Sequence, residues 1–238
     1  MNPNDIIFKW SYLKVFAGTL SYFLFLYFVL APLFQSVCRY LESKGLLTKI
    51  AAGNVSREQI NYEIRHSLGS IVVFGFSSLP VIYLIRNHVV VVAPDTLLNI
   101  VFGVLLLNVW NEIHFFIIHR IMHVSWFMKR VHAVHHRSVI PTAWSVYSFH
   151  WFEALLLSTV PLTLIPFIML SPLAIAVYPL TSILLNYAGH CNYRFGSGSG
   201  PAWQLFGTRH AEHHYKGRRN YGFATNLFDR LFSKEKLK

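Results

Sequence analysis

Long stretches without a charged side chain limit the folds that this chain can adopt. Such stretches occupy residues 15–38, 67–85 and 96–111, and no Lys, Arg, Asp or Glu occurs between residues 154 and 193. A helix needs about 20 mainly apolar residues to cross a bilayer. The first three stretches therefore predict one spanning helix each, over 15–38, 67–92 and 96–118. The fourth contains several prolines and predicts a tight helical hairpin over 154–189 with short arms.

The overall composition agrees with a membrane-embedded chain. Hydrophobic residues make up 54% of the sequence and charged residues only 13%, about half the charged share of a typical soluble domain. The two cysteines, Cys38 and Cys191, are far apart and show no metal-binding spacing. No cleavable signal peptide is evident. We expect an all-α integral membrane protein, with N-terminal transmembrane helices in residues 1–107 and a histidine-rich catalytic region in residues 108–238.

The positive charge is concentrated in segments that the predicted topology places on one side of the membrane. The formal net charge is +11. Residues 39–66, 120–150 and 188–238 contain all of the 21 Lys and Arg residues except Lys9, Lys14 and Arg86. Cytoplasmic loops of membrane proteins carry such an excess. The charge thus predicts a cytoplasmic helical cap and a cytoplasmic C-terminus, and gives no reason to expect a nucleic-acid partner.

Histidines are clustered in short boxes within the second half of the chain. Of the 13 histidines, ten lie between His119 and His214. Residues three and four apart project from one face of a helix, so each box directs its imidazoles toward one place. Neutral imidazole binds iron, zinc, copper and nickel. The boxes are His119-x-x-x-His123, His132-x-x-His135-His136 and His210-x-x-His213-His214.

The number of box histidines exceeds what one ion needs and suits two ions. His190, which follows the predicted hairpin, is a ninth candidate ligand. His150 opens the hairpin and fits a ligand, a supporting role or an interfacial position equally well. We interpret His66, His88 and His114 as capping or interfacial residues. His66 and His88 sit at predicted helix ends, and His114 projects about 140° away from His119 around the helix.

The order of these motifs resembles the fatty acid hydroxylase superfamily, which includes sterol desaturases, methyl sterol oxidases and cholesterol hydroxylases. The resemblance covers roughly residues 108–232. Departures include Glu112 where the family commonly has Asp, Phe116-Ile117 where it has Tyr-Trp, and Trp151 where Pro follows the histidine. The matching residues are Glu112 with His119-Arg120 and His123, then His132, His135 and His136, His150-Trp-Phe-Glu153, His190-Cys-Asn-Tyr-Arg-Phe195, and His210, His213 and His214 followed by Asn220-Tyr-Gly-Phe and Asp229.

The resemblance implies a membrane oxidoreductase that hydroxylates or desaturates a lipid with dioxygen. It implies two iron ions held by the nine histidines, with zinc as an alternative occupant in purified protein. Electrons would come from a separate protein of the cytochrome b5 or ferredoxin type. Among the remaining polar residues, Glu153 and Asp229 are expected to orient histidines, and Glu112, Asn192 and His150 are further candidates for a ligand or supporting role.

Other classes of protein fit less well, and the substrate stays open. A ferritin-like di-iron protein needs a Glu-x-x-His motif on each of two helices, and this sequence contains one, Glu63-Ile-Arg-His66. A zinc protease needs His-Glu-x-x-His, which is absent. A transmembrane haem or metal-binding protein without oxygenase activity is the remaining alternative. Sterols, fatty acyl chains and related lipids are all compatible with the sequence. The membrane would be the endoplasmic reticulum in a eukaryote, where Lys234 to Lys238 fits a retrieval signal, or the inner membrane in a bacterium.

Overall fold

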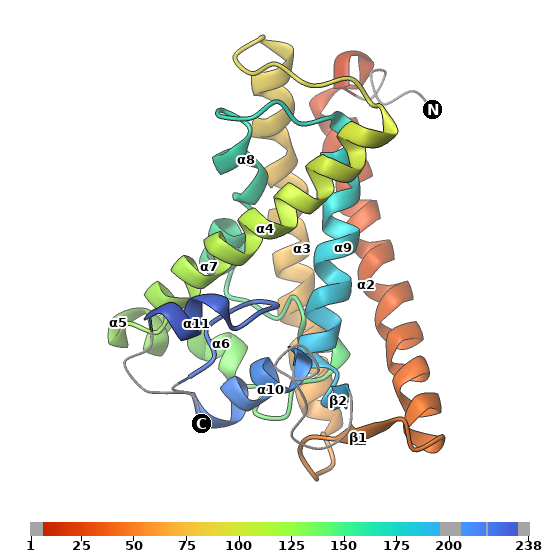
Figure 1. The fold of residues 1–238 in the computed structure, drawn as a ribbon, viewed down its shortest axis with the longest axis vertical. Helices are drawn as coiled ribbons and strands as arrows, with labels where there is room; N and C mark the ends of the chain where they lie inside the picture. The colour runs from red at the N-terminus through yellow and green to blue at the C-terminus, as the bar shows by residue number, and fades with distance from the viewer. Residues whose placement is uncertain (1–6, 196–205, 218, 233–238) are drawn as a thin grey trace.

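The computed structural model describes residues 7–195, 206–217 and 219–232, and most of these residues are helical (Figure 1). Four helices are long and apolar enough to cross a membrane, which confirms the predicted all-α membrane fold. They are α2 (Tyr12–Ser43), α3 (Arg57–Arg86), α4 (Leu97–Met122) and α9 (Pro172–His190). The basic tail over Lys234 to Lys238 and the Gly/Ser-rich stretch before Pro201 lie outside the described residues.

Shorter elements surround one end of this bundle. Figure 1 shows α5, α6, α10 and α11 gathered at the end opposite the N-terminus, together with a two-stranded antiparallel sheet. The sheet pairs Leu47 with Phe195 and joins the end of α2 to the segment after α9. The short elements are β1 (Leu47–Lys49), α5 (Ser125–Phe127), the π-helix η1 (Met128–His132), α6 (Ala133–His136), the 3-10 helix η2 (Ala143–Ser145), α7 (Trp151–Leu157), α8 (Val160–Leu164), β2 (Tyr193–Phe195), α10 (Phe206–Lys216) and α11 (Leu227–Phe232).

Each spanning helix begins at a hydroxyl residue that caps its first turn. The side chains of Ser11, Ser56, Thr96 and Ser171 accept a hydrogen bond from the backbone N–H three residues later. Such caps satisfy N–H groups that have no partner inside the helix. Pro172 follows its cap at the first position of α9, where a missing N–H costs nothing. The apolar stretches therefore predict the helices, and the caps decide where the helices start.

Several boundaries differ from the sequence prediction. α3 begins at Arg57 rather than at Ser67, so His66 lies inside the helix and not at its end. α3 ends at Arg86 rather than continuing to Val92, because His88 adopts a left-handed conformation (φ 54°) and the N–H of Val89 bonds back to the Leu84 carbonyl. This arrangement closes a helix C-terminus. The first arm of the expected hairpin consists of two short helices, α7 and α8, rather than one, whereas its second arm is the full-length α9.

The helices pack closely in the half of the bundle that leads to the histidine boxes. Tyr27 and Tyr187 are fully buried, and their hydroxyls donate to the carbonyls of Trp144 (2.7 Å) and Leu26 (3.0 Å). α4 and α9 touch at Gly103, where an added Cβ would lie 2.6 Å from the Cβ of Ala174. This contact requires glycine and lies near the N-terminal ends of both helices, opposite the ends that carry the histidines.

Candidate metal centre

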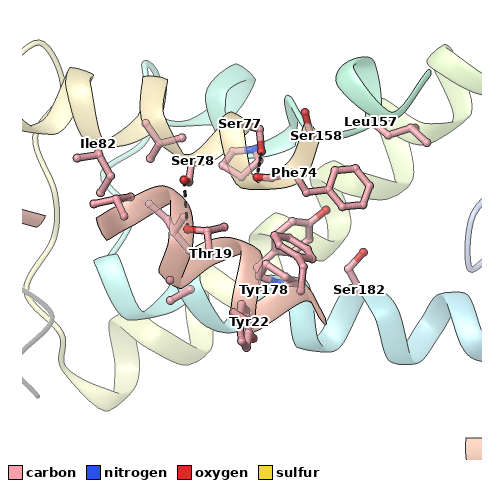
Figure 2. Close-up of a pocket in the computed structure, with 18 of the residues that line it drawn as sticks. Thr19, Tyr22, Phe74, Ser77, Ser78, Ile82, Leu157, Ser158, Tyr178 and Ser182 are labelled. Carbon is pink, nitrogen blue, oxygen red and sulfur yellow. Dashed lines mark hydrogen bonds between the residues drawn. The ribbon is translucent and has the colours of Figure 1, made fainter. Parts of the chain in front are cut away.

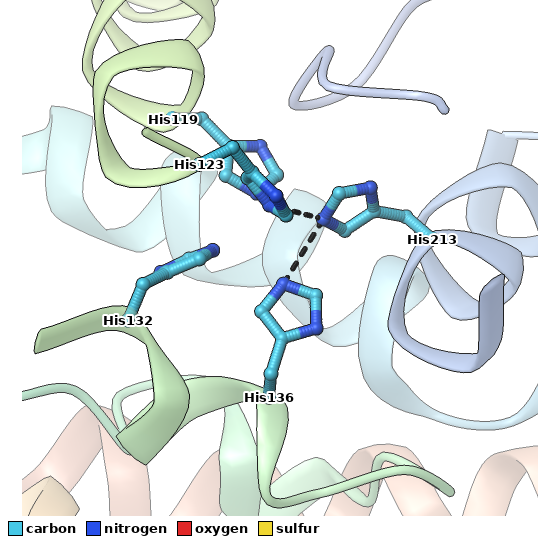
Figure 3. Close-up of side chains that lie close together, drawn as sticks. All are labelled: His119, His123, His132, His136 and His213. Atoms are coloured by element: carbon cyan, nitrogen blue, oxygen red, sulfur yellow. Dashed lines mark hydrogen bonds between the residues drawn. The ribbon is translucent and has the colours of Figure 1, made fainter. Parts of the chain in front are cut away.

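All nine histidines predicted as ligands lie in two compact groups. Within each group, one nitrogen from every imidazole lies within 4.8 Å of the others. We call them the five-histidine group, drawn in Figure 3, and the four-histidine group. The five-histidine group is His119, His123, His132, His136 and His213, and the four-histidine group is His135, His190, His210 and His214.

The HxxHH boxes are divided between the two groups. In the second box, His132 and His136 point to the five-histidine group and His135 points to the other. In the third box, on α10, His213 belongs to the five-histidine group, whereas His210 and His214 belong to the four-histidine group. Positions i and i+4 share a helix face, and the residue between them lies on a neighbouring face. One box can therefore serve two adjacent sites.

The two groups adjoin each other, and nitrogens within each group face one another. His213 Nε2 lies 3.0 Å from His123 Nε2 and 3.1 Å from His136 Nε2 (Figure 3). In the other group, His190 Nε2 lies 3.4 Å from His135 Nε2 and 3.2 Å from His210 Nε2. The two groups meet at the rings of His136 and His214, whose centroids lie 5.0 Å apart.

Backbone carbonyls and one carboxylate hold the outer nitrogens of the rings. The Nδ1 atoms of His119 and His213 bond to the carbonyls of Tyr221 (2.9 Å) and Arg219 (2.5 Å). Those of His135 and His190 bond to the carbonyls of Ser148 (3.3 Å) and Asn186 (2.9 Å), and that of His132 bonds to Glu153 Oε1 (2.8 Å). A backbone carbonyl can only accept, so the Nδ1 atoms of His119, His135, His190 and His213 carry the proton. The Nε2 atom of each of these rings therefore carries an unshared lone pair.

This donor set fits a metal cation. Within the described residues, the buried Nε2 atoms of His119 and His132 and both ring nitrogens of His214 have no hydrogen-bond partner. Two lone pairs that face each other, as on His135 and His190, repel unless a cation lies between them. Burial lowers the pKa of His123 to about 4 and that of His136 to about 3, so both are neutral at physiological pH. Histidine clusters of this kind can hold metal ions.

Glu153 is the only predicted supporting carboxylate with a bond to a histidine among the described residues. Asp229, also expected to orient a histidine, instead accepts the backbone N–H groups of Tyr221 and Gly222 (both 2.9 Å). Glu112 accepts the N–H groups of Ala224 (2.8 Å) and Thr225 (3.1 Å). These two acids therefore act on the histidines through the backbone rather than by direct contact.

The segment 219–225 is a backbone clamp for two ligand candidates. Its Arg219 and Tyr221 carbonyls hold His213 and His119, while Glu112 and Asp229 hold its N–H groups. An added Cβ at Gly222 would lie 2.1 Å from the Thr225 carbonyl oxygen and 3.2 Å from an oxygen of each acid. Only glycine fits at position 222, which explains on steric grounds why the motif Asn220-Tyr-Gly-Phe contains a glycine.

The remaining candidates lie outside both groups. His150 caps α7, with its Nδ1 accepting from the Phe152 N–H (3.2 Å). The side chain of Asn192 bonds to the N–H and carbonyl of Ala51, next to the small sheet. His114 Nε2 lies 3.0 Å from the hydroxyl of Thr159, and His66 packs beside the ring of Tyr62. None of these contacts involves a ligand candidate.

An uncharged cavity of about 470 Å³ lies within the bundle (Figure 2). Phe115, Phe149 and Phe223 line its inner end, and the rings of Phe115 and Phe149 lie 4.9 Å from His119 and 4.7 Å from His135. From Leu173 to Asn186 it follows α9 over about 20 Å, at 1.5 Å per residue. None of its described lining residues is Lys, Arg, Asp or Glu.

Some residues of the centre could not be identified from the sequence. The carbonyls of Ser148, Asn186 and Arg219 act through the backbone, which every residue possesses. The ring of Tyr221 lies 4.9 Å from that of His123 and 5.3 Å from that of His213, although the residue belongs to no histidine box. Its place in the Asn-Tyr-Gly-Phe motif was the available signal.

Comparisons with known proteins agree with the geometry. A family model described as "Fatty acid hydroxylase" matches residues 104–234, more than half of the chain. A Delta(7)-sterol 5(6)-desaturase, erg32 of Schizosaccharomyces pombe, is 31% identical over 132 residues, which are 56% of this chain and 39% of that protein. The match thus covers less than half of the relative's length. No solved structure matches the chain.

Proposed function

The chain belongs to the fatty acid hydroxylase family, and from this premise we propose that it is a multi-pass membrane oxidoreductase that hydroxylates or desaturates a lipid with dioxygen. One observation carries the proposal. Two groups of neutral, inward-facing imidazoles lie at the inner end of an uncharged cavity within a bundle of spanning helices.

We propose that each histidine group holds one iron ion, and that zinc could replace iron in purified protein. The nine histidines are the ligands in this proposal: His119, His123, His132, His136 and His213 for one ion, and His135, His190, His210 and His214 for the other. A bound iron pair would supply the activation of dioxygen, with electrons from a separate donor. The nitrogens of each group lie within 4.8 Å of one another, which leaves no space for a haem macrocycle between them.

The residues of this chain would hold the imidazoles in position for the metal ions and keep water away from the substrate. The carbonyls of Tyr221, Arg219 and Ser148 keep the proton on Nδ1 and leave Nε2 free for the metal. The phenyl rings of Phe115 and Phe149 separate the histidines from the cavity and exclude water from the reacting carbon. A C–H bond of a lipid that fills the cavity would lie beside these rings.

The uncharged lining of the cavity supports a lipid substrate whose buried part carries no charge. A sterol nucleus or a fatty acyl chain satisfies this requirement, because burying a charge in an apolar cavity is costly. The printed name of the S. pombe relative describes a sterol desaturase, which supports the sterol. The excess of Lys and Arg on the histidine side supports a cytoplasmic centre, in the endoplasmic reticulum or a bacterial inner membrane.

Metal analysis of detergent-purified protein tests the proposal. About two iron ions per chain are expected, as the two histidine groups imply. The double substitution His135→Ala and His213→Ala removes one ligand from each group and should abolish both metal retention and oxygen-dependent conversion of sterols or fatty acyl lipids. His66→Ala, outside both groups, is the control. A metal-free wild type, or a haem absorption spectrum, would refute the proposal.

A further inference from the structure

One amide side chain that lines the cavity has no hydrogen-bond partner. Asn111 lies on α4 and is only 6% exposed. Among the described residues, no group donates to its Oδ1 or accepts from its Nδ2. By contrast, Asn108, one turn earlier, donates to the hydroxyl of Thr181 (2.8 Å). Asn186 donates to the carbonyl of Val146 (2.8 Å). Both sides of the Asn111 amide are thus open to a molecule in the cavity.

An open amide in apolar surroundings costs free energy unless a partner pairs with it. Water can satisfy Asn111 while the cavity holds no lipid. A lipid that displaces this water must replace its hydrogen bonds, or binding is weakened. None of the described lining residues is charged, so the matching group on the lipid is polar and neutral.

Other polar side chains of the cavity do not need a ligand in the same way. Ser77 donates to the Phe74 carbonyl (2.8 Å). Ser78 donates to the Gly75 carbonyl (2.8 Å), and Thr19 donates to Ser78 Oγ (3.2 Å) (Figure 2). Each hydroxyl has a single proton, so these three protons are already bonded within the protein. The amide protons of Asn111 are not.

The position of Asn111 links it to the histidines. Asn111, Phe115 and His119 are spaced by four residues and lie on one face of α4. The Phe115 ring lies 4.9 Å from that of His119. The eight residues from Asn111 to His119 span about 12 Å along the helix. A group held by Asn111 would therefore determine how far the rest of the lipid extends toward the histidines.

We propose that Asn111 binds a hydroxyl group of the lipid in the cavity and thereby determines which carbon meets the metal centre. A hydroxyl both donates and accepts, so it can serve Oδ1 as well as Nδ2. A ketone or ester oxygen only accepts and would leave Oδ1 unpaired. The inference rests on the proposed function and narrows its substrate to uncharged lipids with a hydroxyl within about 12 Å of the reacting carbon.

Lipid binding without turnover tests the proposal. The metal-loaded protein is kept free of dioxygen and reductant. The probes are cholesterol and octadecan-1-ol, each compared with its own methyl ether, which accepts but cannot donate. We expect at least one alcohol to bind about 10-fold more tightly than its ether. Asn111→Leu is similar in size but cannot hydrogen-bond, and it should abolish this preference. A merely steric rejection of the ether would persist in that variant.

Asn108→Leu is the matched control, because it removes an amide from the same helix but outside the cavity lining. It should keep the preference for the alcohol. Melting temperatures in detergent separate the two roles further. Asn108→Leu breaks a hydrogen bond within the protein and should melt at a lower temperature. Asn111→Leu should melt no lower than the wild type, since no bond within the described residues is lost.

Three results would overturn the proposal: no preference for either alcohol in the wild type, a preference that survives Asn111→Leu, or a lower melting temperature of Asn111→Leu. Binding needs no turnover, so a protein that prefers the alcohol but oxidises no lipid would refute the proposed function and leave this role of Asn111 standing. Where oxidation occurs, Asn111→Leu should give products oxidised at more than one carbon. A product oxidised at the same single carbon as in the wild type would contradict the positioning role.

Discussion

At the scale of single residues, the protonation of each imidazole depends on a partner on its outer side. Four of the outer partners are carbonyl oxygens and one is the carboxylate of Glu153. A carboxylate partner also makes the imidazole a stronger donor to a metal. Burial raises the pKa of Glu153 to about 8 in the metal-free protein, and a cation held by His132, whose Nδ1 lies 2.8 Å from Glu153 Oε1, would favour the carboxylate. Glu153 is therefore the most informative side chain to change.

Replacing Glu153 with Ala should weaken metal retention by roughly 10- to 100-fold, the usual cost of losing such a partner. Glu153→Gln keeps an acceptor oxygen beside His132 and should restore part of the affinity. Competition with a chelator measures the effect. Glu58→Ala, at an exposed position in the first turn of α3, is the matched control. Equal metal affinity in Glu153→Ala and wild type would contradict the role.

The sequence predicted candidate ligands well at this scale but their partners poorly. The spacing of the boxes identified eight of the nine histidines that the structure gathers, because i, i+3 and i+4 positions converge on a helix. The ninth, His190, belongs to no box and was a candidate because it follows the predicted hairpin. Their assignment as ligands stays a proposal. The carbonyl partners leave no trace in the sequence. Asp229 illustrates the limit: its position suggested a histidine partner, but it holds backbone N–H groups.

At the scale of elements, the segment between α10 and α11 determines how two histidine-bearing helices meet. Residues 219–225 bond through their carbonyls to His213 on α10 and His119 on α4. Glu112 and Asp229 hold the same segment in place. A disturbance of this clamp would therefore move imidazoles from two helices at once.

Gly222→Ala tests the clamp. Its new Cβ would lie 2.1 Å from the Thr225 carbonyl oxygen, so the segment must shift. We expect a loss of about 1–3 kcal/mol in the free energy of unfolding, seen as a lower melting temperature in detergent, and less bound metal. Gly69→Ala is the control, since nothing lies within 4 Å of the added Cβ there. A variant with wild-type melting temperature and metal content would show that the clamp is dispensable.

The spanning elements were easier to predict than their ends and their breaks. Apolar length alone predicted α2, α3 and α4, because a bilayer requires it. α3 ends where His88 adopts a left-handed conformation. Nothing in the sequence indicated this end, because the apolar residues Val89–Val92 suggested that the helix continues. The break between α7 and α8 and the pairing of β1 with β2 involve tertiary contacts, which periodicity does not report.

At the scale of the whole molecule, the buried histidines link folding to pH. Burial keeps the pKa of several histidines below the ordinary 6.5, at about 4 for His123 and about 3 for His136. As pH falls below 6.5, the unfolded chain takes up protons that the folded metal-free protein does not. Stability therefore rises with pH in this window and falls as the solution becomes acidic.

We expect the melting temperature of the metal-free protein to fall steadily between neutral pH and about pH 4. His123→Asn removes one of these groups and should make the decline shallower. Bound metal should protect the protein until the ligands become protonated. A metal-free protein whose melting temperature is constant over this range would show that the histidines are not buried as neutral groups.

The arrangement of the third box has a consequence for biogenesis. Both groups include histidines of α10, and the clamp that holds two of the rings extends to Thr225. During synthesis, neither site can close when α2, α3, α4 and α9 enter the bilayer, because α10 follows all of them. If each group holds a metal ion as proposed, loading would be a late event in maturation, after the spanning helices are assembled. On the proposed function, a chain stalled before His210 would be inserted in the membrane without a complete metal site.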